Sequence, residues 1–312
     1  MTPLFAGHEN EPVNLHGMLP PTATPFTADG AIDLASMRFN VERWMATGLR
    51  GLVLLGTNSE AAFVDDDEAD RVVTAVRERV PPDRELVVGT GRESTRATIA
   101  ASVRAAAAGA TVVLVRTPMA FRSQLTAEAL VRHFTAVADA SPVPVLLYNF
   151  AAAFGVNLPT RAVVKLAEHP NVAGMKESGG DLAQIADQVS QTPGRFVVVV
   201  GSAPTLYASL CVGATGGVVA VANVVPEMCV RLYELFHAGR HAEALTLQRL
   251  LSPLARLVTS GHGVPGLKVA MTMAGYRGGF PRLPLVPAAS DAVNEIRGAL
   301  DALRQASGAM HA

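Results

Sequence analysis

A lysine closes the short apolar run Val172–Lys176, and a Ser-Gly-Gly turn follows it at residues 178–180. A run of this length with such an exit predicts a buried strand that leads into a helix. At the end of an interior strand, an apolar wall disfavours the ammonium form and favours a neutral amine, which can condense with a carbonyl as a Schiff base. A strand-end lysine can also extend its amine to solvent, so the choice depends on the rest of the chain.

Polar residues close other apolar runs in the same way. A hydroxyl-rich turn follows one run at Gly56–Glu60, Tyr148 ends another, and Gly201-Ser202 ends a third. Singly, Tyr148 could be a rim aromatic, and Thr57 and Asn58 could form an ordinary side-chain-capped turn. If the runs are parallel strands of one closed sheet, however, these groups share an edge with Lys176. Together they provide a nucleophile, a proton carrier and donors for a carboxylate, which predicts imine chemistry.

The elements that must position these groups alternate almost from end to end. The expected strands are Leu19–Ala23, Gly51–Leu55, Leu86–Gly89, Thr111–Val115, Val145–Tyr148, Val172–Lys176, Phe196–Val200 and Gly217–Val221. The expected helices between them are Leu34–Thr47, Asp67–Val80, Ser94–Ala108, Ala127–Ala140, Thr160–Glu168, Asp181–Ser190, Ala203–Val212 and Pro226–Ala238. Such α/β alternation with continuous apolar strands predicts a parallel sheet covered by helices, and eight units close a (β/α)8 TIM barrel. No Gly-x-Gly-x-x-Gly motif opens the first helix, which argues against a dinucleotide-binding sheet.

Two regions lie outside this alternation. Residues 1–17 are expected to form an N-terminal arm, and residues 18–240 the barrel. Residues 241–312 hold three more helical patterns, Ala242–Val258, Val264–Ala274 and Ala288–Gln305. We expect them to form a C-terminal helical extension packed on the barrel.

The composition excludes several classes of protein. The 312 residues are 49% hydrophobic and carry a net charge of −1, which gives no basic footprint for nucleic acid or for a membrane surface. Cys211 and Cys229 are expected to be reduced packing residues, and no secretory signal opens the chain. We therefore expect a cytoplasmic protein.

Three weaker signals have simpler explanations. His237 and His241 have a metal-binding spacing, but Gly239 interrupts them, and no metal site is expected. The turn Gly89–Glu93 could cradle a phosphate, although a plain strand-to-helix turn explains it as well. The acidic run Asp65–Glu68 is expected to cap a helix.

Several motifs together resemble a known family. They are Gly56-Thr57-Asn58-Ser59-Glu60, Tyr148-Asn149, Gly174-Met175-Lys176-Glu177-Ser178-Gly179-Gly180 and Gly213-Ala214-Thr215-Gly216-Gly217. The order and spacing of these motifs are similar to those of the pyruvate-dependent class I aldolases, the family of dihydrodipicolinate synthase and N-acetylneuraminate lyase. The segments Gly91–Thr95, His169–Val172 and Gly263–Lys268 are most similar to 4-hydroxy-2-oxoglutarate aldolase.

The resemblance implies roles for individual residues. Lys176 matches the Schiff-base lysine, and Tyr148 matches the tyrosine that shuttles protons. Thr57 and Asn58 match the turn that holds the pyruvate carboxylate, with the Thr57 hydroxyl also relaying protons to Tyr148. The rest of the substrate pocket would be lined by Ser178, Gly201 and Val219.

The chain departs from the family pattern on the side of the second substrate, where Phe121, Ala153 and Phe154 are expected. Dihydrodipicolinate synthases have an arginine in place of Ala153, and many members have a Tyr-Tyr pair where this chain has Met119-Ala120-Phe121. The missing arginine argues against dihydrodipicolinate synthesis. Phenylalanines here predict an apolar pocket.

The expected function is therefore a Schiff-base aldolase or lyase acting on a 4-hydroxy-2-oxo acid, with pyruvate as the ketone component. Two alternatives remain: a dehydratase or hydratase-aldolase that uses the same imine on an apolar or aromatic substrate, and a catalytically silent 2-oxo acid binder. No cofactor is expected beyond the covalent imine at Lys176. The partners are a small 2-oxo acid and an aldehyde, and the resemblance implies a homotetramer built as a dimer of dimers.

Overall fold

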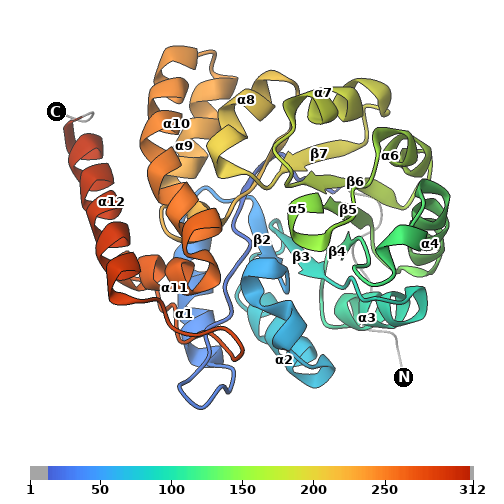
Figure 1. Ribbon diagram of the computed structural model, residues 1–312, viewed down its shortest axis with the longest axis horizontal. Helices are drawn as coiled ribbons and strands as arrows, with labels where there is room; N and C mark the ends of the chain where they lie inside the picture. Colours follow the sequence, from blue (N-terminus) through green and yellow to red (C-terminus); the bar gives the residue numbers. More distant parts are fainter. Residues whose placement is uncertain (1–12, 310–312) are drawn as a thin grey trace.

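Eight parallel strands form the centre of the molecule in the computed structural model, which describes residues 13–309 (Figure 1). In sheet order the neighbours are β1-β8-β7-β6-β5-β4-β3-β2. The strands are β1 Gly17–Leu19, β2 Gly51–Leu54, β3 Glu85–Gly89, β4 Val112–Arg116, β5 Val145–Asn149, β6 Val172–Glu177, β7 Val197–Val200 and β8 Gly216–Val218. A bridge between Pro21 and Val53 joins the two outer strands, so the sheet closes into the predicted (β/α)8 barrel.

The first strand lies earlier in the chain than its pattern suggested. β1 covers Gly17–Leu19, whereas the expected strand was Leu19–Ala23. Pro20 and Pro21 have no N–H to donate to a ladder, which shortens the regular pairing at this point. The chain nevertheless continues beside β2, because the N–H of Val53 donates to Pro20 O at 3.0 Å and that of Thr22 to Val53 O at 2.9 Å.

Helices surround the barrel between successive strands (Figure 1). They are α1 Leu34–Met45, α2 Asp66–Arg77, α3 Thr95–Ala107, α4 Ala127–Ala140, α6 Thr160–Ala167, α7 Leu182–Gln191, α8 Leu206–Cys211 and α9 Pro226–His237, with one further turn, α5, at Ala151–Phe154. Side-chain caps mark the starts of α1, α2, α3, α4 and α7. Asp65 and Glu68 form a capping box at α2, as the acidic run predicted, and Asp181 accepts two backbone N–H groups at the start of α7.

Two packed layers follow from the alternation along each strand. Inside the barrel lie Leu19, Val53, Val87, Leu114, Leu146, Tyr148, Val199 and Val218. The intervening strand residues belong to the larger core between the sheet and the helices. Leu15, in the stretch expected to be a loose arm, is fully buried in the inner layer. Residues 1–12 of the expected N-terminal arm, which was residues 1–17, lie outside the described residues.

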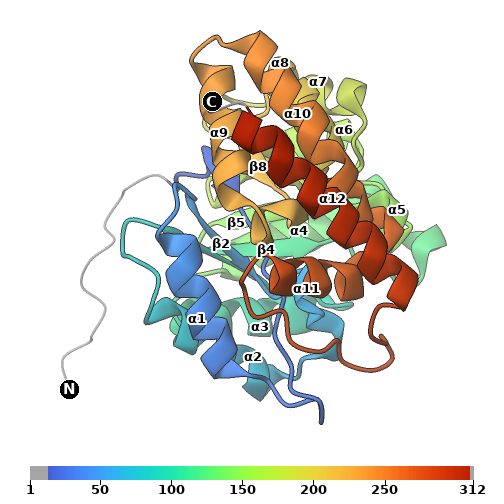
Figure 2. The ribbon, with the colours of Figure 1, turned by 90° about the vertical axis from the view of Figure 1, so that its left-hand side faces the viewer.

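The C-terminal segment packs against the barrel as helices. It comprises α10 His241–Arg256, a π-helical turn at Leu257–Gly261, α11 Gly263–Met273 and α12 Ser290–Ala309. α10 contacts α8 and α9, and α12 lies across α10 and α11 (Figure 2).

Candidate active site

Lys176 points into the barrel from β6. It pairs in register with Tyr148 on β5 and with Val199 on β7, and only 5% of its surface is exposed. Its Nζ lies 4.3 Å from the centre of the Tyr148 ring. The prediction that the lysine and the tyrosine share one edge of the sheet is therefore confirmed by their positions.

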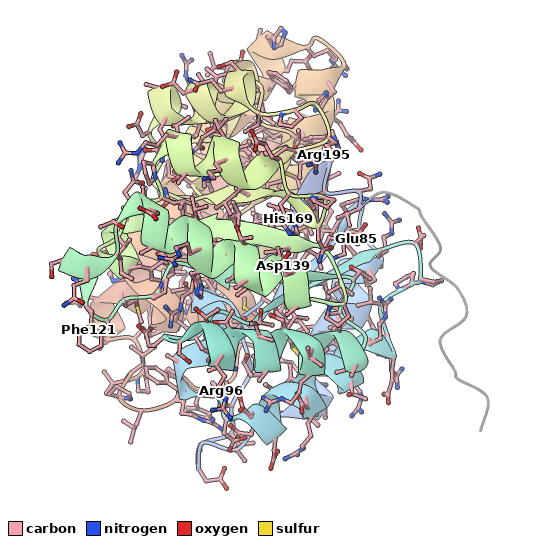
Figure 3. All side chains as sticks on the ribbon, turned by 90° about the vertical axis from the view of Figure 1, so that its right-hand side faces the viewer. Glu85, Arg96, Phe121, Asp139, His169 and Arg195 are labelled. Carbon is pink, nitrogen blue, oxygen red and sulfur yellow. The ribbon has the colours of Figure 1, made fainter. Side chains whose placement is uncertain are left out.

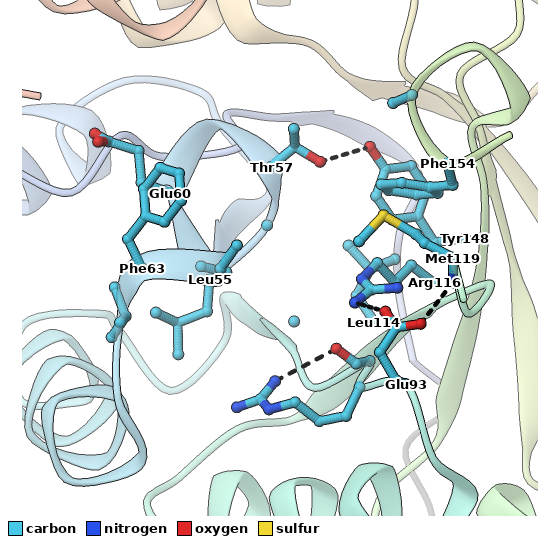
Figure 4. A pocket seen from close by; sticks show the side chains of 18 of the residues that line it. Leu55, Thr57, Glu60, Phe63, Glu93, Leu114, Arg116, Met119, Tyr148 and Phe154 are labelled. Atoms are coloured by element: carbon cyan, nitrogen blue, oxygen red, sulfur yellow. Dashed lines mark hydrogen bonds and ion pairs between the residues drawn. The ribbon is translucent and has the colours of Figure 1, made fainter. Parts of the chain in front are cut away.

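Tyr148 connects this lysine to the turn after β2. The Thr57 hydroxyl lies 3.4 Å from the Tyr148 hydroxyl (Figure 4). This is a long hydrogen bond. The Tyr148 ring therefore lies against the lysine amine, and its hydroxyl lies close to a second hydroxyl through which a proton can pass.

The turn at Thr57–Ser59 is a short 3-10 helix with rigid supports. Ser59 Oγ donates to Thr22 O at 2.5 Å, and Thr24 Oγ1 donates to Ser59 O at 2.9 Å. Thr57 and Asn58 occupy the first positions of this helical turn, where backbone N–H groups have no partner within the helix. Those N–H groups are suited to a carboxylate.

Glycine at position 201 makes room beside the lysine. A Cβ at Gly201 would lie 1.9 Å from Ser178 Oγ and 3.1 Å from Lys176 Cε. Ser178 and Gly201 therefore both adjoin Lys176, as expected. Val219 does not, because its fully buried side chain belongs to the core between sheet and helices. That predicted pocket residue is corrected to a packing residue.

A cavity of about 540 Å³ opens between the ends of β2, β3, β4 and β5 (Figure 4). Thr57, Tyr148, Ala153 and Phe154 line it. Phe121 does not line it. The Phe121 side chain is 80% exposed and lies at the periphery of the molecule (Figure 3). The second-substrate side thus includes Ala153 and Phe154 but not Phe121.

The cavity is less apolar than the phenylalanines suggested. Besides Phe63 and Phe154, its wall contains the charged residues Glu60, Arg92, Glu93 and Arg116. The sequence argument missed Arg116 because the expected fourth strand ended at Val115, one residue earlier. The alternation of side chains in β4 could have revealed Arg116. Leu114 points into the barrel, so the next inward-facing position is residue 116.

A buried polar network fixes the two strand ends that carry Tyr148 and Lys176. The Glu177 carboxylate, 1% exposed, accepts bonds from Asn149 Nδ2 at 2.7 Å, from Gly179 N at 2.7 Å and from Gln184 Nε2 at 3.1 Å. Asn149 Oδ1 in turn accepts the N–H of Leu158 at 2.9 Å. Because Asn149 follows Tyr148 and Glu177 follows Lys176, this network holds the reactive pair in place.

A second buried pair anchors the turn after β2 to the C-terminal extension. Lys268 Nζ on α11 lies 2.5 Å from Glu60 Oε1, with both side chains almost fully buried. Glu60 Oε2 also accepts the N–H of Arg282 at 2.7 Å. Burial lowers the pKa of Lys268, and the Glu60 carboxylate opposes this shift.

Within residues 13–309, no three His, Cys, Asp or Glu side chains gather as metal ligands. No helix in the same part of the chain is long and apolar enough to cross a membrane.

The sequence matches the Dihydrodipicolinate synthetase family over residues 14–303. It is 34% identical over 286 residues to a 4-hydroxy-tetrahydrodipicolinate synthase from Exiguobacterium sp., covering 91% of this chain and 97% of that protein. A protein of Emericella nidulans, named probable 4-hydroxy-2-oxoglutarate aldolase, mitochondrial, is 34% identical over 280 residues, covering 88% of this chain and 90% of that one. The crystal structure of a dihydrodipicolinate synthase from Bacillus anthracis superposes with a TM-score of 0.89 at 26% identity, covering 93% of this chain and 98% of that chain.

Fold and site together define the class: this protein is an enzyme, a Schiff-base-forming lyase on a (β/α)8 barrel. The chain belongs to the Dihydrodipicolinate synthetase family. The family resemblance in the sequence is thereby confirmed.

Proposed function

We propose that the chain is an aldolase that cleaves, or forms, the C3–C4 bond of a 4-hydroxy-2-oxo acid through an imine at Lys176. The observation that carries this proposal is the buried amine of Lys176 at 4.3 Å from the Tyr148 ring, with the Thr57 hydroxyl 3.4 Å from the phenol. A nucleophile, a proton carrier and a relay hydroxyl thus lie at one barrel edge.

The steps follow from these positions. The Lys176 amine adds to the C2 ketone and water leaves, which gives an imine. The N–H groups of Thr57 and Asn58 bind the C1 carboxylate. Tyr148 takes the proton of the C4 hydroxyl as the C3–C4 bond breaks and passes its own phenolic proton to the Thr57 hydroxyl, which hands a proton on to water. The bonding electrons pass into the protonated imine. An aldehyde leaves, the resulting enamine is protonated at C3, and water releases pyruvate from the lysine.

Similarity to named relatives supports this choice of substrate class. One relative is named a probable 4-hydroxy-2-oxoglutarate aldolase and another a 4-hydroxy-tetrahydrodipicolinate synthase. Ala153 supports the aldolase, because it stands where the sequence resemblance implies an arginine in dihydrodipicolinate synthases. The proposed reaction produces pyruvate and a short aldehyde.

A second candidate is a dehydratase or hydratase-aldolase acting on an aromatic substrate. It is favoured by an aromatic cluster in which the Phe154 ring lies 5.2 Å from Tyr148 and 5.9 Å from Phe150. The same imine would form in either case. A dehydratase would release a product with the carbon skeleton of its substrate, and a hydratase-aldolase working in the synthetic direction would join that skeleton to an aryl aldehyde. Analysis of the products distinguishes this second candidate from the proposed aldolase.

Reductive trapping tests the central step. Pyruvate with borohydride should add one reduced pyruvyl group to the peptide that contains Lys176, and Lys176→Arg should abolish the adduct because a guanidinium stays protonated. Lys165, exposed on α6, provides a matched control in Lys165→Arg, which should trap normally. An adduct on another lysine would disprove the assignment, and no adduct with any 2-oxo acid would favour a silent binder.

We also propose a cytoplasmic homotetramer that needs no cofactor beyond the covalent imine. The near-neutral charge of the chain, the organisation implied by its family and the buried position of Lys176 support this.

A further inference from the structure

We propose that Arg116 binds the carboxylate at C5 of the substrate, and that the enzyme therefore selects 4-hydroxy-2-oxo dicarboxylates. This inference rests on the proposed aldolase function and names the substrate class of the same site.

The first support is the order of residues along the barrel edge. In register, Arg116 on β4 pairs with Tyr148 on β5, which pairs with Lys176 on β6. Residues paired across parallel strands point to the same face, and neighbouring strands lie about 4.8 Å apart. In the proposed reaction Lys176 bonds to C2 of the substrate and Tyr148 contacts the oxygen on C4. The next strand in the same direction is β4, and its residue in register lies beside the substituent at C5. That group faces a guanidinium.

The second support is the way in which Arg116 is held. Its Nη1 donates to Thr117 O at 2.9 Å, and its Nη2 donates to Glu93 Oε1 at 2.8 Å. Its guanidinium carbon lies 5.6 Å from the centre of the Phe154 ring. A guanidinium has five N–H donors in a rigid fork, so these bonds orient the group and leave donors for a ligand in the cavity that it lines.

The negative charge of Glu93 does not prevent an anion from binding to Arg116, because the Glu93 carboxylate is already fully hydrogen-bonded. Its second oxygen, Oε2, accepts the N–H groups of Met119 and Ala120, each at 2.8 Å. Burial opposes its ionisation, but those N–H donors and the Arg116 guanidinium outweigh this and lower the pKa of Glu93. The carboxylate is thus an ionised and saturated support for Arg116, comparable to the partners that orient arginine in other anion sites.

Gly91 provides the space that Arg116 needs. A Cβ at Gly91 would lie 2.7 Å from Arg116 Cγ and 2.8 Å from Arg116 N. The glycine turn after β3, which could have been a phosphate cradle, therefore accommodates the arginine stem.

The other charged groups of the cavity wall are bound elsewhere. Arg92 is paired with Asp66 at 3.2 Å, and Glu60 is held by Lys268. Of the cations that line the cavity within the described chain, Arg116 is the one in line with Tyr148 and Lys176.

A matched substrate pair tests the inference. The dicarboxylate 4-hydroxy-2-oxoglutarate and 4-hydroxy-2-oxopentanoate differ in having a carboxylate or a methyl group on C4. Arg116→Met should lower kcat/KM for the dicarboxylate about 10- to 100-fold, the effect of about one charge-assisted hydrogen bond. For the methyl substrate we expect less than about a threefold change. Arg116→Lys should restore part of the preference, and Arg92→Met should affect both substrates alike.

Two further readouts keep this result separate from the aldolase proposal. Trapping of pyruvate at Lys176 should be unchanged in Arg116→Met, which shows that the variant is folded and forms the imine. In a Lys176→Ala background, which cannot turn over, calorimetry should show tighter binding of the dicarboxylate only when Arg116 is present. Equal losses for both substrates, or equal affinities with and without Arg116, would overturn the inference even if trapping succeeds.

Discussion

Tyr148 is the side chain that both halves of the site share, because it contacts the Lys176 amine and the Thr57 hydroxyl. Tyr148→Phe should lower kcat for aldol cleavage about 10²- to 10⁴-fold, since it removes the group that transfers the proton. Thr57→Val should lower kcat less and should alter the pH profile of kcat. If the two hydroxyls form one relay, the double variant should be no slower than Tyr148→Phe alone. Fully additive losses would show that they act separately.

The residues of the site were predictable where their position follows from the end of a strand. Lys176 and Tyr148 each end a continuous apolar run in the sequence, and the fold places these two residues in register on neighbouring strands. Arg116 was missed because it continues β4 as an inward-facing residue, and a charge within a strand resembles the start of a loop. Val219 was misplaced for the opposite reason: period-2 alternation turns it toward the helices. One-residue differences of this kind decide which side chains reach the cavity, and composition does not reveal them.

Among the elements, the junction after β7 limits side-chain size next to the reactive lysine. Gly201→Ala should abolish pyruvate trapping or slow it strongly, because its Cβ would overlap Ser178 Oγ at 1.9 Å and press on Lys176 Cε at 3.1 Å. Gly194→Ala is the matched control, since a Cβ there meets nothing within 4 Å. Rates of borohydride-dependent mass addition would compare them. Normal trapping by Gly201→Ala would show that Ser178 moves freely and does not define the pocket.

Element boundaries were predicted well where caps mark them and less well where proline intervenes. α4 begins and ends at Ala127 and Ala140, as its periodicity and the Thr126 cap indicate. The range predicted for β1 was wrong because Pro20 and Pro21 are apolar and fit a strand pattern, but they cannot donate hydrogen bonds to a neighbouring strand. The contacts between the Thr57 turn and the C-terminal extension could not be inferred at all, because no local pattern reports which distant segment pairs with Glu60.

At the scale of the whole molecule, the Glu60–Lys268 pair joins barrel and extension. Lys268→Met should lower the free energy of unfolding by about 3–5 kcal/mol, because it leaves a buried carboxylate without its cation. The double variant Glu60→Gln/Lys268→Met should lose less than the sum of the single losses. Urea unfolding measures both, with Lys165→Met as the exposed control. KM for pyruvate should rise as well, because the Thr57 turn loses its anchor. An unchanged KM would show that the Glu60–Lys268 pair stabilises the fold without affecting substrate binding.

Assembly is the second property of the whole molecule that can be tested. Phe121 is 80% exposed, and the segment after α11 exposes Leu283 at 75% and Val286 at 62%. Large apolar side chains on a free surface favour association. We expect light scattering at micromolar concentration to give a tetramer or at least a dimer, and Phe121→Asp to shift the protein toward smaller species. A monomeric wild-type protein would contradict this.

The bond from Arg282 to Glu60 spans 222 residues of sequence. By the time β8 has been synthesised, a nascent chain already contains every barrel strand and the lysine on β6. It still lacks both groups that hold Glu60, one on α11 and one just beyond it. The carboxylate-binding turn therefore acquires its final support only when nearly the whole polypeptide exists. We therefore expect a chain that ends before α11 to bind its 2-oxo acid more weakly than the full-length protein, because Glu60 lacks both of its distant partners.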